Sequence, residues 1–180
     1  MGVFTVGRLT SVPVASSPGL VGAPTLAALE RLGLLDDVGV VEIDPELSDT
    51  ARNQEAYGLP PETLANCVVV AGKREGVEKV AACMVLASTR ADVNNVVRKR
   101  IDVRKATFLG RDDAIERTGM EYGGITPIGL PEDWPVLVDA AVATQPVLVI
   151  GSGVRRSKLM LPGATLASLP TAQIVESLGR

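Results

Sequence analysis

The chain has 180 residues, of which 46% are apolar and 22% are charged, as in an ordinary globular domain with a full core. Its net charge of −3 argues against a protein that binds polyanions over its whole surface. The sequence contains no histidine, which excludes Ser-His-Asp and Cys-His catalytic groupings.

Residues 1–24 are rich in Ser, Pro, Gly and Val and are expected to form a loosely ordered or extended arm. The later elements follow from hydrophobic runs, helix-end charges and Gly/Pro boundaries. In chain order they are a helix at 25–35, a strand at 38–43, a helix at 45–57, strands at 66–71 and 79–87 joined by a turn at 72–76, helices at 91–100 and 111–118, strands at 136–139, 147–150 and 157–161, and a helix at 171–178. The order lacks a regular βαβ alternation, which predicts an α+β fold with a mixed sheet or partly open β-barrel surrounded by helices.

The two cysteines, Cys67 and Cys83, each lie inside an apolar run. This pattern favours small buried thiols in a reducing cytosol over a disulfide or a reactive pair. Without histidine or a CxxC spacing, neither a metal ion nor another cofactor is expected. The N-terminus does not have the pattern of a signal peptide, and the apolar runs are far shorter than the roughly 20 residues that span a bilayer. We therefore expect a cytoplasmic protein without a membrane partner.

The most informative segment is residues 118–131, which holds four glycines and two prolines. Glycine allows positive φ and close approach of another molecule, and proline stiffens the turn. The segment is either a structural turn or a platform whose backbone N–H groups bind an anion or an oxyanion. Gly123 and Pro127 frame a GxxxP spacing within it, and Gly124 permits close backbone approach.

Two basic groups stand out in this acidic chain. Residues 98–105 carry five positive charges and one negative charge, and Arg155, Arg156 and Lys158 follow a Gly-Ser-Gly turn. Such groups are either solvated surface or contacts to the phosphates of a nucleic acid.

Asp139, at the end of an apolar strand, is either a turn cap or a carboxylate held by hydrogen bonds to nearby backbone. Trp134 is interpreted as a packing anchor in preference to a base-stacking platform.

Several blocks together resemble a known family. These are residues 79–87, 104–108, 118–129, 138–139 and 149–153. Their order and spacing are similar to those of the YbaK/ProX family, also called the prolyl-tRNA-synthetase-associated domain, from about residue 38 to the C-terminus. The resemblance implies a mixed β-barrel-like core and trans-editing, which is hydrolysis of the ester bond of mischarged aminoacyl-tRNA. It implies aminoacylated tRNA as a partner and an aminoacyl-tRNA synthetase as a further one.

The resemblance also implies the site residues. The loop from Gly123 to Pro127 is expected to line the pocket, with chemistry that depends on water or on the substrate's own groups. Family members commonly carry a lysine early in the strand where this chain has Asn66, which can donate a hydrogen bond but brings no charge. Catalytic roles are expected for Gly123, Gly124, Pro127 and Asn66; substrate binding for Asn66, Lys73, Ile125, Thr126, Gly129, Asp139, Gly151 and Gly153; and tRNA binding for Arg98, Lys99, Arg100, Arg104, Lys105, Arg155, Arg156 and Lys158.

The chain is thus expected to comprise an N-terminal arm and short helix at 1–37 and an editing domain at 38–180. The leading hypothesis is an aminoacyl-tRNA deacylase. The alternatives are a non-catalytic module that binds tRNA or the aminoacyl group, and a regulatory domain that binds a free amino acid or small nucleotide. Valine-rich strand edges and the arm are both candidate surfaces for a homodimer.

Overall fold

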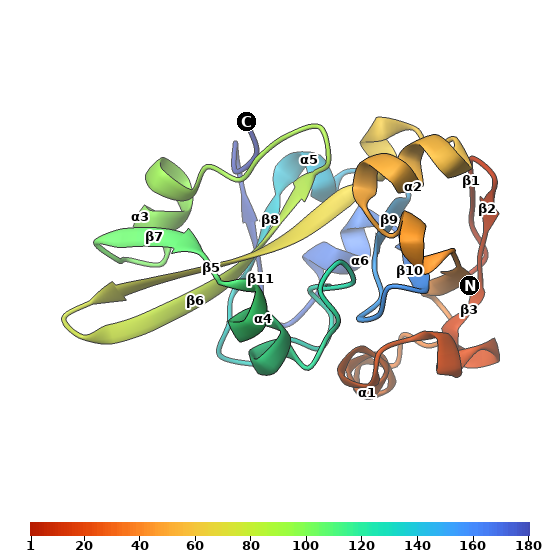
Figure 1. Ribbon diagram of the computed structural model, residues 1–180, viewed down its shortest axis with the longest axis horizontal. Helices are drawn as coiled ribbons and strands as arrows, with labels where there is room; N and C mark the ends of the chain where they lie inside the picture. Colours follow the sequence, from red (N-terminus) through yellow and green to blue (C-terminus); the bar gives the residue numbers. More distant parts are fainter.

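Two β-sheets that meet at one edge form the centre of the molecule (Figure 1). The structure is a computed structural model and describes all residues, 1–180. The smaller sheet is antiparallel and has the strand order β3 (Val12–Pro13), β4 (Gly39–Glu42), β10 (Ser157–Leu161) and β9 (Leu148–Gly151). The larger sheet is mixed and has the order β11 (Ala172–Val175), β8 (Val136–Asp139), β6 (Val77–Leu86), β5 (Ala65–Arg74) and β7 (Lys105–Phe108).

The sheets are joined by a parallel bridge between Leu64, just before β5, and Val149 of β9. The strands do not close into a barrel, since β3 and β11 are the outer strands of separate sheets. The expected α+β class with a mixed, partly open core is therefore confirmed. The junction of the two sheets is also the place where the site described below is formed.

A long hairpin of β5 and β6 extends away from this junction (Figure 1). Its turn consists of Glu75 and Gly76, whose φ angles are 52° and 81°, and is shorter than the turn expected at 72–76. Positive φ at both central residues matches the twist of a two-residue hairpin turn. β7 pairs with the outer half of β5, so the basic residues 98–105 lie beside the far end of the hairpin.

Six α-helices surround the sheets: α1 (Ala23–Leu32), α2 (Thr50–Tyr57), α3 (Arg98–Arg100), α4 (Arg111–Thr118), α5 (Ala140–Ala143) and α6 (Gly163–Ala167). α2 begins at Asp49, whose carboxylate accepts hydrogen bonds from the N–H groups of Ala51 and Arg52. It ends at Gly58, which takes the left-handed conformation with φ of 62°. These two caps fix the position of the short helix that carries part of the site.

Several predicted elements differ from the structure. The helix expected at 171–178 is wrong, because Ala172–Val175 forms strand β11 alongside β8, where Ile174 is the register partner of Val138. The helix expected at 45–57 is interrupted after the 3-10 turn Pro45–Leu47, and Asp49 starts α2 anew. The segment 91–100 is a π-helical turn, Val93–Val97, followed by α3. Strand β7 and helices α5 and α6 were not predicted.

The N-terminal residues are extended, as expected, but they are tied to the body of the protein. β1 (Thr5–Val6) and β2 (Leu9–Thr10) form a small hairpin, and β3 pairs with β4 in the smaller sheet. Val14, which directly follows β3, is fully buried in the main hydrophobic cluster. The division of the chain at residues 37 and 38 stays a prediction.

The largest core cluster contains side chains of both sheets and of α1, including Leu29, Met84 and Leu159.

Both cysteines are free, and burial raises the pKa of the Cys83 thiol to about 12. This agrees with the expectation that the cysteines are unreactive packing residues. None of the helices has the length and apolar character needed to cross a membrane.

Candidate active site

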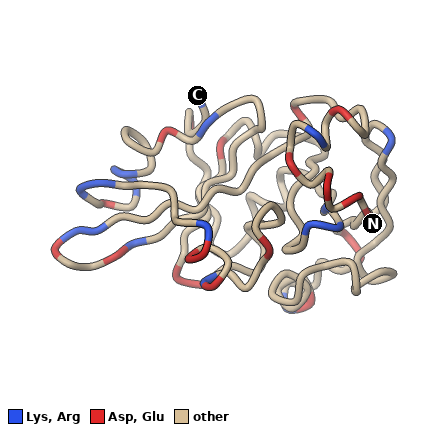
Figure 2. The backbone as a smooth tube through the Cα atoms, in the orientation of Figure 1, with Lys and Arg blue, Asp and Glu red and all other residues tan.

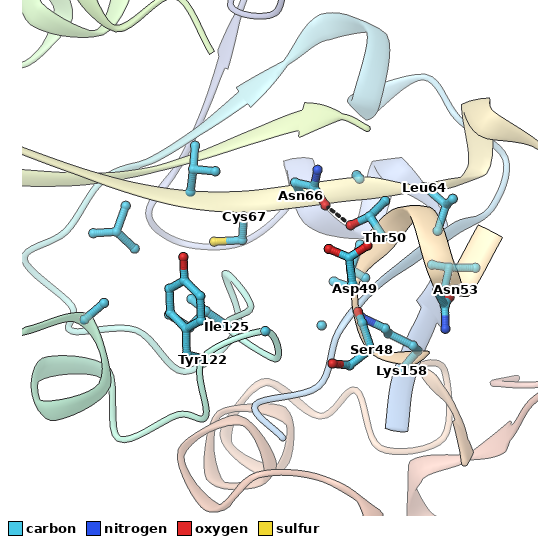
Figure 3. Close-up of a pocket in the computed structure, with 18 of the residues that line it drawn as sticks. Ser48, Asp49, Thr50, Asn53, Leu64, Asn66, Cys67, Tyr122, Ile125 and Lys158 are labelled. Atoms are coloured by element: carbon cyan, nitrogen blue, oxygen red, sulfur yellow. Dashed lines mark hydrogen bonds between the residues drawn. The ribbon is translucent and has the colours of Figure 1, made fainter. Parts of the chain in front are cut away.

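A cavity of about 530 Å³ opens at the junction of the two sheets (Figure 3). Its walls come from parts of the chain that are far apart in sequence. They are the segment 48–53 at the start of α2, the segment 64–69 at the start of β5, the segment 108–125 from the end of β7 through α4 to the glycine-rich loop, and strands β9 and β10. A cavity of this size accommodates a small ligand or the end of a larger one.

Lys158 supplies a positive charge inside this cavity. Its side chain is only 8% exposed, and Nζ donates a hydrogen bond of 3.1 Å to the carbonyl oxygen of Ser48. The pKa of Lys158 is lowered to about 8, chiefly by burial; the Asp49 carboxylate opposes this shift, and Arg155 adds to it by a smaller amount. At neutral pH the group is still mostly an ammonium ion, with two N–H bonds free of protein partners. Lys158, expected among the tRNA-binding residues, thus lies in the cavity and not on an open surface.

Asn66 lies in the same cavity and is oriented by α2. The hydroxyl of Thr50 donates a 2.8 Å hydrogen bond to Oδ1 of Asn66, which leaves the amide Nδ2 without a protein partner (Figure 3). The cavity thus holds a lysine, Lys158 on β10, although Asn66 on β5 brings no charge at the position where the family resemblance led us to expect one.

The glycine-rich loop contributes Gly123 and Ile125 to the cavity wall. The N–H groups of these two residues make no hydrogen bond within the protein. Gly124 has another role, because its N–H donates to the carbonyl of Glu121 and its carbonyl accepts from Gly153. A Cβ atom at Gly124 would lie 2.5 Å from the backbone of Val154, so the close approach there is to the protein's own chain.

The other residues expected in the substrate site are divided by the structure. Gly151 lines the cavity with Asn66, whereas Pro127 and Gly129 line a second cavity of about 340 Å³ against α1. Thr126 is fully buried, and Gly153 packs against Gly22. Asp139 caps α5 by accepting the N–H of Ala141 at 2.8 Å, and its second oxygen accepts the N–H of Gly179. This matches the interpretation of Asp139 as a turn cap.

The basic residues are also divided. Arg98, Lys99, Arg100, Arg104 and Lys105 do not line the cavity; their segment lies beside the far end of the hairpin, where Arg74 and Lys79 pair with Asp102. Figure 2 shows Lys and Arg residues gathered at this end of the molecule. Lys73 belongs to this end, because it is the register partner of Lys105. Lys73 lies seven positions after Asn66 along β5, which corresponds to about 23 Å at 3.3 Å per residue. Arg155 and Arg156 lie on the other side of the site and donate to the carbonyls of Pro45 and Gly19.

Two aromatic side chains at the cavity were not singled out from the sequence. Phe108 is 59% exposed and Tyr122 is 49% exposed, and both line the cavity. They are the only exposed aromatic residues among the five in the chain. The Arg111 guanidinium lies 5.0 Å from the centre of the Tyr122 ring. Trp134, by contrast, is buried and packs against Arg117, which confirms that it is a packing anchor.

A thiol at the cavity wall does not provide a nucleophile. Cys67 lines the cavity, and burial, with a smaller contribution from Cys83, raises the pKa of its thiol above the usual range. The thiolate is the reactive form, so Cys67 stays unreactive at neutral pH. The polar groups that line the cavity are therefore the Lys158 ammonium, the Asp49 carboxylate, the two amides of Asn53 and Asn66, the hydroxyls of Ser48, Thr50 and Tyr122, and free backbone N–H groups.

Comparison with known proteins identifies the family of this fold. Residues 44–169 match the aminoacyl-tRNA editing domain. The chain belongs to this family. The resemblance to the YbaK/ProX family is thereby confirmed.

Individual relatives are distant. The uncharacterized protein YwhH of Bacillus subtilis (strain 168) is 22% identical over 135 residues, which cover 75% of this chain and 83% of YwhH. The crystal structure of a candidate trans-editing enzyme for prolyl-tRNA synthetase matches with a TM-score of 0.73 and 20% identity, over 86% of this chain and 94% of that one. The hypothetical protein APE2540 matches with a TM-score of 0.75 and 16% identity, over 87% and 99% of the two chains.

Proposed function

We propose that this editing-domain protein hydrolyses the ester bond between an amino acid and the terminal ribose of a mischarged tRNA, acting in trans. The observation that carries the proposal is the ammonium group of Lys158, which is held inside the cavity with two N–H bonds free of protein partners. Family membership supports the reaction class, and the contents of the pocket support the route described next.

In the proposed reaction a water molecule attacks the ester carbonyl. The carbonyl oxygen becomes negatively charged, and the ammonium of Lys158 and the free N–H groups of Gly123 and Ile125 are the available donors for it. Preorganised donors of this kind lower the barrier because they are already oriented when the charge develops. The attacking water gives up one proton to solvent, the carbonyl re-forms as the bond from carbon to the ribose oxygen breaks, and the ribose oxygen takes one proton from solvent. A free amino acid and intact tRNA leave. Asn66 orients the substrate through Nδ2.

The mouth of the cavity suits the end of an RNA strand. Unpaired bases stack on exposed aromatic rings, and each such contact is worth about 1–3 kcal/mol. Phe108 and Tyr122 are exposed at the cavity, where the terminal adenine would lie if the ester bond reached Lys158. The proposal therefore places the base at the aromatic residues and the ester deeper in the pocket.

The body of the tRNA would then contact the far end of the hairpin. Lys73 and Lys105 are directly opposite each other on β5 and β7. Like charges in such a position destabilise a sheet, so a phosphate ligand between them provides a reason for the pair. Arg104 is also exposed there and makes no ion pair within the protein.

A deacylation screen tests the proposal. The purified protein is incubated with labelled tRNAs that carry non-cognate amino acids, beginning with tRNA for proline because of the structural neighbour. We expect release from a subset of substrates, and loss of that release in Lys158→Met. Arg90→Met serves as control, because Arg90 is an exposed basic residue outside the cavity and outside the basic end of the hairpin. If wild-type protein binds charged tRNA but releases no amino acid, the non-catalytic binding module is correct instead.

A further inference from the structure

Asn53 of α2 is a buried amide without a partner. Its side chain is fully buried, lines the cavity, and has no hydrogen bond at either Nδ2 or Oδ1. The two other buried side chains with an unpartnered atom, Thr25 and Thr126, do not line this cavity. Since both amide atoms of Asn53 are free, exchanging their assignment still leaves one donor and one acceptor facing no protein group.

Such a group calls for an explanation, because buried polar atoms in folded proteins almost always have a hydrogen-bond partner. The position of Asn53 is fixed by the helix that carries it, because α2 is capped by Asp49 at its N-terminus and by Gly58 at its C-terminus. A helix held in this way keeps Asn53 at the wall of the cavity whether or not a ligand is present. The missing partner is therefore expected to come from the ligand.

The order of residues along the cavity indicates which part of the ligand this is. Figure 3 shows Tyr122 toward one end, Ser48 and Lys158 further along, and Asn53 beside Leu64 at the opposite end. This step rests on the proposed function, in which the adenine lies at the aromatic mouth and the ester carbonyl lies at Lys158. The group that extends beyond the carbonyl is then the side chain of the amino acid.

We propose that Asn53 selects aminoacyl groups whose side chain ends in a hydroxyl or a carboxamide. Both groups donate and accept hydrogen bonds, as the free amide of Asn53 requires. A carboxylate only accepts, so it leaves Oδ1 of Asn53 unpaired. An aliphatic side chain leaves both atoms unpaired in the bound state.

We expect a large difference in affinity between polar and apolar aminoacyl groups, because binding of an apolar group leaves the buried amide of Asn53 without a hydrogen bond. A site built to hydrogen-bond a polar group rejects the analogue that lacks it by up to about 10⁴–10⁵-fold, whereas a missing methylene gives only about 10–200-fold. Pairs of side chains with the same shape and different polarity therefore isolate the contribution of Asn53. Threonine with valine and asparagine with leucine are two such pairs.

The first test measures binding without hydrolysis. Amide-linked aminoacyl-adenosine analogues that carry threonine, valine, asparagine or leucine are titrated against the full-length protein by calorimetry. We expect the polar member of each pair to bind at least about tenfold more tightly than its apolar isostere, the lower part of the range for a hydrogen-bonding site. Equal or tighter binding of the valine and leucine analogues overturns the proposal, whatever the outcome of the deacylation screen.

The second test changes the residue. Asn53→Leu is expected to weaken binding of the polar analogues and to leave the apolar analogues unchanged or tighter, so that the preference disappears. Gln54→Leu is the matched control, because Gln54 is the neighbouring amide on α2 and does not line the cavity. A preserved preference in folded Asn53→Leu overturns the proposal. If that variant does not fold, the wild-type ratio still decides it.

Hydrolysis of tRNAs charged with the same four amino acids separates the two proposals. Preferential release of threonine or asparagine supports both. Preferential binding of the polar analogues without any release supports selection by Asn53 and refutes hydrolysis. Release that favours valine or leucine refutes selection by Asn53 while the hydrolytic function stands.

Discussion

The ammonium nitrogen of Lys158 lies 3.1 Å from the carbonyl oxygen of Ser48, and this is its only hydrogen bond within the protein. The bond connects β10 to the segment that leads into α2, so one side chain joins two walls of the cavity. It also places the positive charge in a cavity whose only other charged lining residue is Asp49. The first prediction follows from this contact.

The rate of enzymatic deacylation is expected to fall as pH rises through about 8, because the ammonium form of Lys158 is lost there. The rate is measured as a pH profile after subtraction of spontaneous ester hydrolysis. Arginine stays charged at all these pH values, so the deacylation rate of Lys158→Arg should not fall near pH 8, whatever its absolute level. A wild-type rate that increases through pH 8 would instead assign Lys158 the role of a general base.

The same titration affects stability. The pKa of Lys158 is lowered in the folded state, so between about pH 8 and its ordinary value near 10.5 the unfolded chain binds a proton that the folded protein does not. The contribution of Lys158 to the free energy of unfolding therefore increases with pH in this window. Urea unfolding should show that, from pH 8 to 10, the free energy of unfolding of the wild-type protein increases relative to that of Lys158→Met. A constant difference would mean that Lys158 is not buried as a cation.

Removal of the exposed aromatic rings should weaken RNA binding independently of charge. Phe108→Ala and Tyr122→Ala are each expected to reduce affinity for a short single-stranded RNA ending in CCA by about 1–3 kcal/mol, the range for one stacked base. Fluorescence anisotropy at fixed salt measures this. Ile174→Ala is the control, because Ile174 is an exposed apolar residue on β11, outside the cavity. Unchanged affinity in both aromatic variants would show that the terminal adenine does not bind at Phe108 and Tyr122.

The basic end of the hairpin should affect the salt dependence of tRNA binding. Each phosphate contact that is lost reduces the slope of log K against log salt by about 1. Arg104→Ala and Lys105→Ala are therefore expected to lower both the affinity and the slope, with kcat unchanged at saturating tRNA. Arg90→Ala, an exposed arginine elsewhere, serves for comparison. A normal slope in both variants would place the tRNA body on another surface.

The local pattern of the sequence was sufficient for elements that are specified locally. The hairpin of β5 and β6, helix α4 and the loop after it follow from β-branched runs and glycine boundaries. Strand β11 could not be recognised because its conformation depends on pairing with β8, which is remote in the sequence. The pattern of residues 172–175 carries no signal that distinguishes this pairing from a short helix.

The site was predicted less completely than the fold, for two physical reasons. Lys158 was grouped with Arg155 and Arg156 by charge, yet it begins an apolar run, Lys158-Leu159-Met160-Leu161, that forms a fully buried strand. That run was the available signal for a buried lysine. Asn53 carried no signal, because its importance comes from the absence of a partner, which only the tertiary structure reveals.

Asp139 was predicted to bind substrate, but its carboxylate caps α5. Asp139→Ala removes the bonds to the N–H groups of Ala141 and Gly179, so we expect a loss of about 1–3 kcal/mol in the free energy of unfolding. Deacylation per folded molecule should be unchanged. Thermal and urea unfolding measure the first quantity, and Asp133→Ala, an exposed aspartate without such bonds, is the control. Loss of activity in a stable Asp139→Ala protein would restore Asp139 to the substrate site.

Asn53→Leu should be more stable than the wild-type protein when no ligand is present. A buried polar group without a partner costs about 1–3 kcal/mol, and an apolar side chain of similar shape removes that cost. Residues that serve ligands commonly reduce the stability of the free protein in this way, so the gain should be accompanied by a loss of ligand selection. Urea unfolding of Asn53→Leu beside Gln54→Leu measures the difference. A marked loss of stability in Asn53→Leu would show that the amide has a structural partner, such as a bound water, and is not reserved for the substrate.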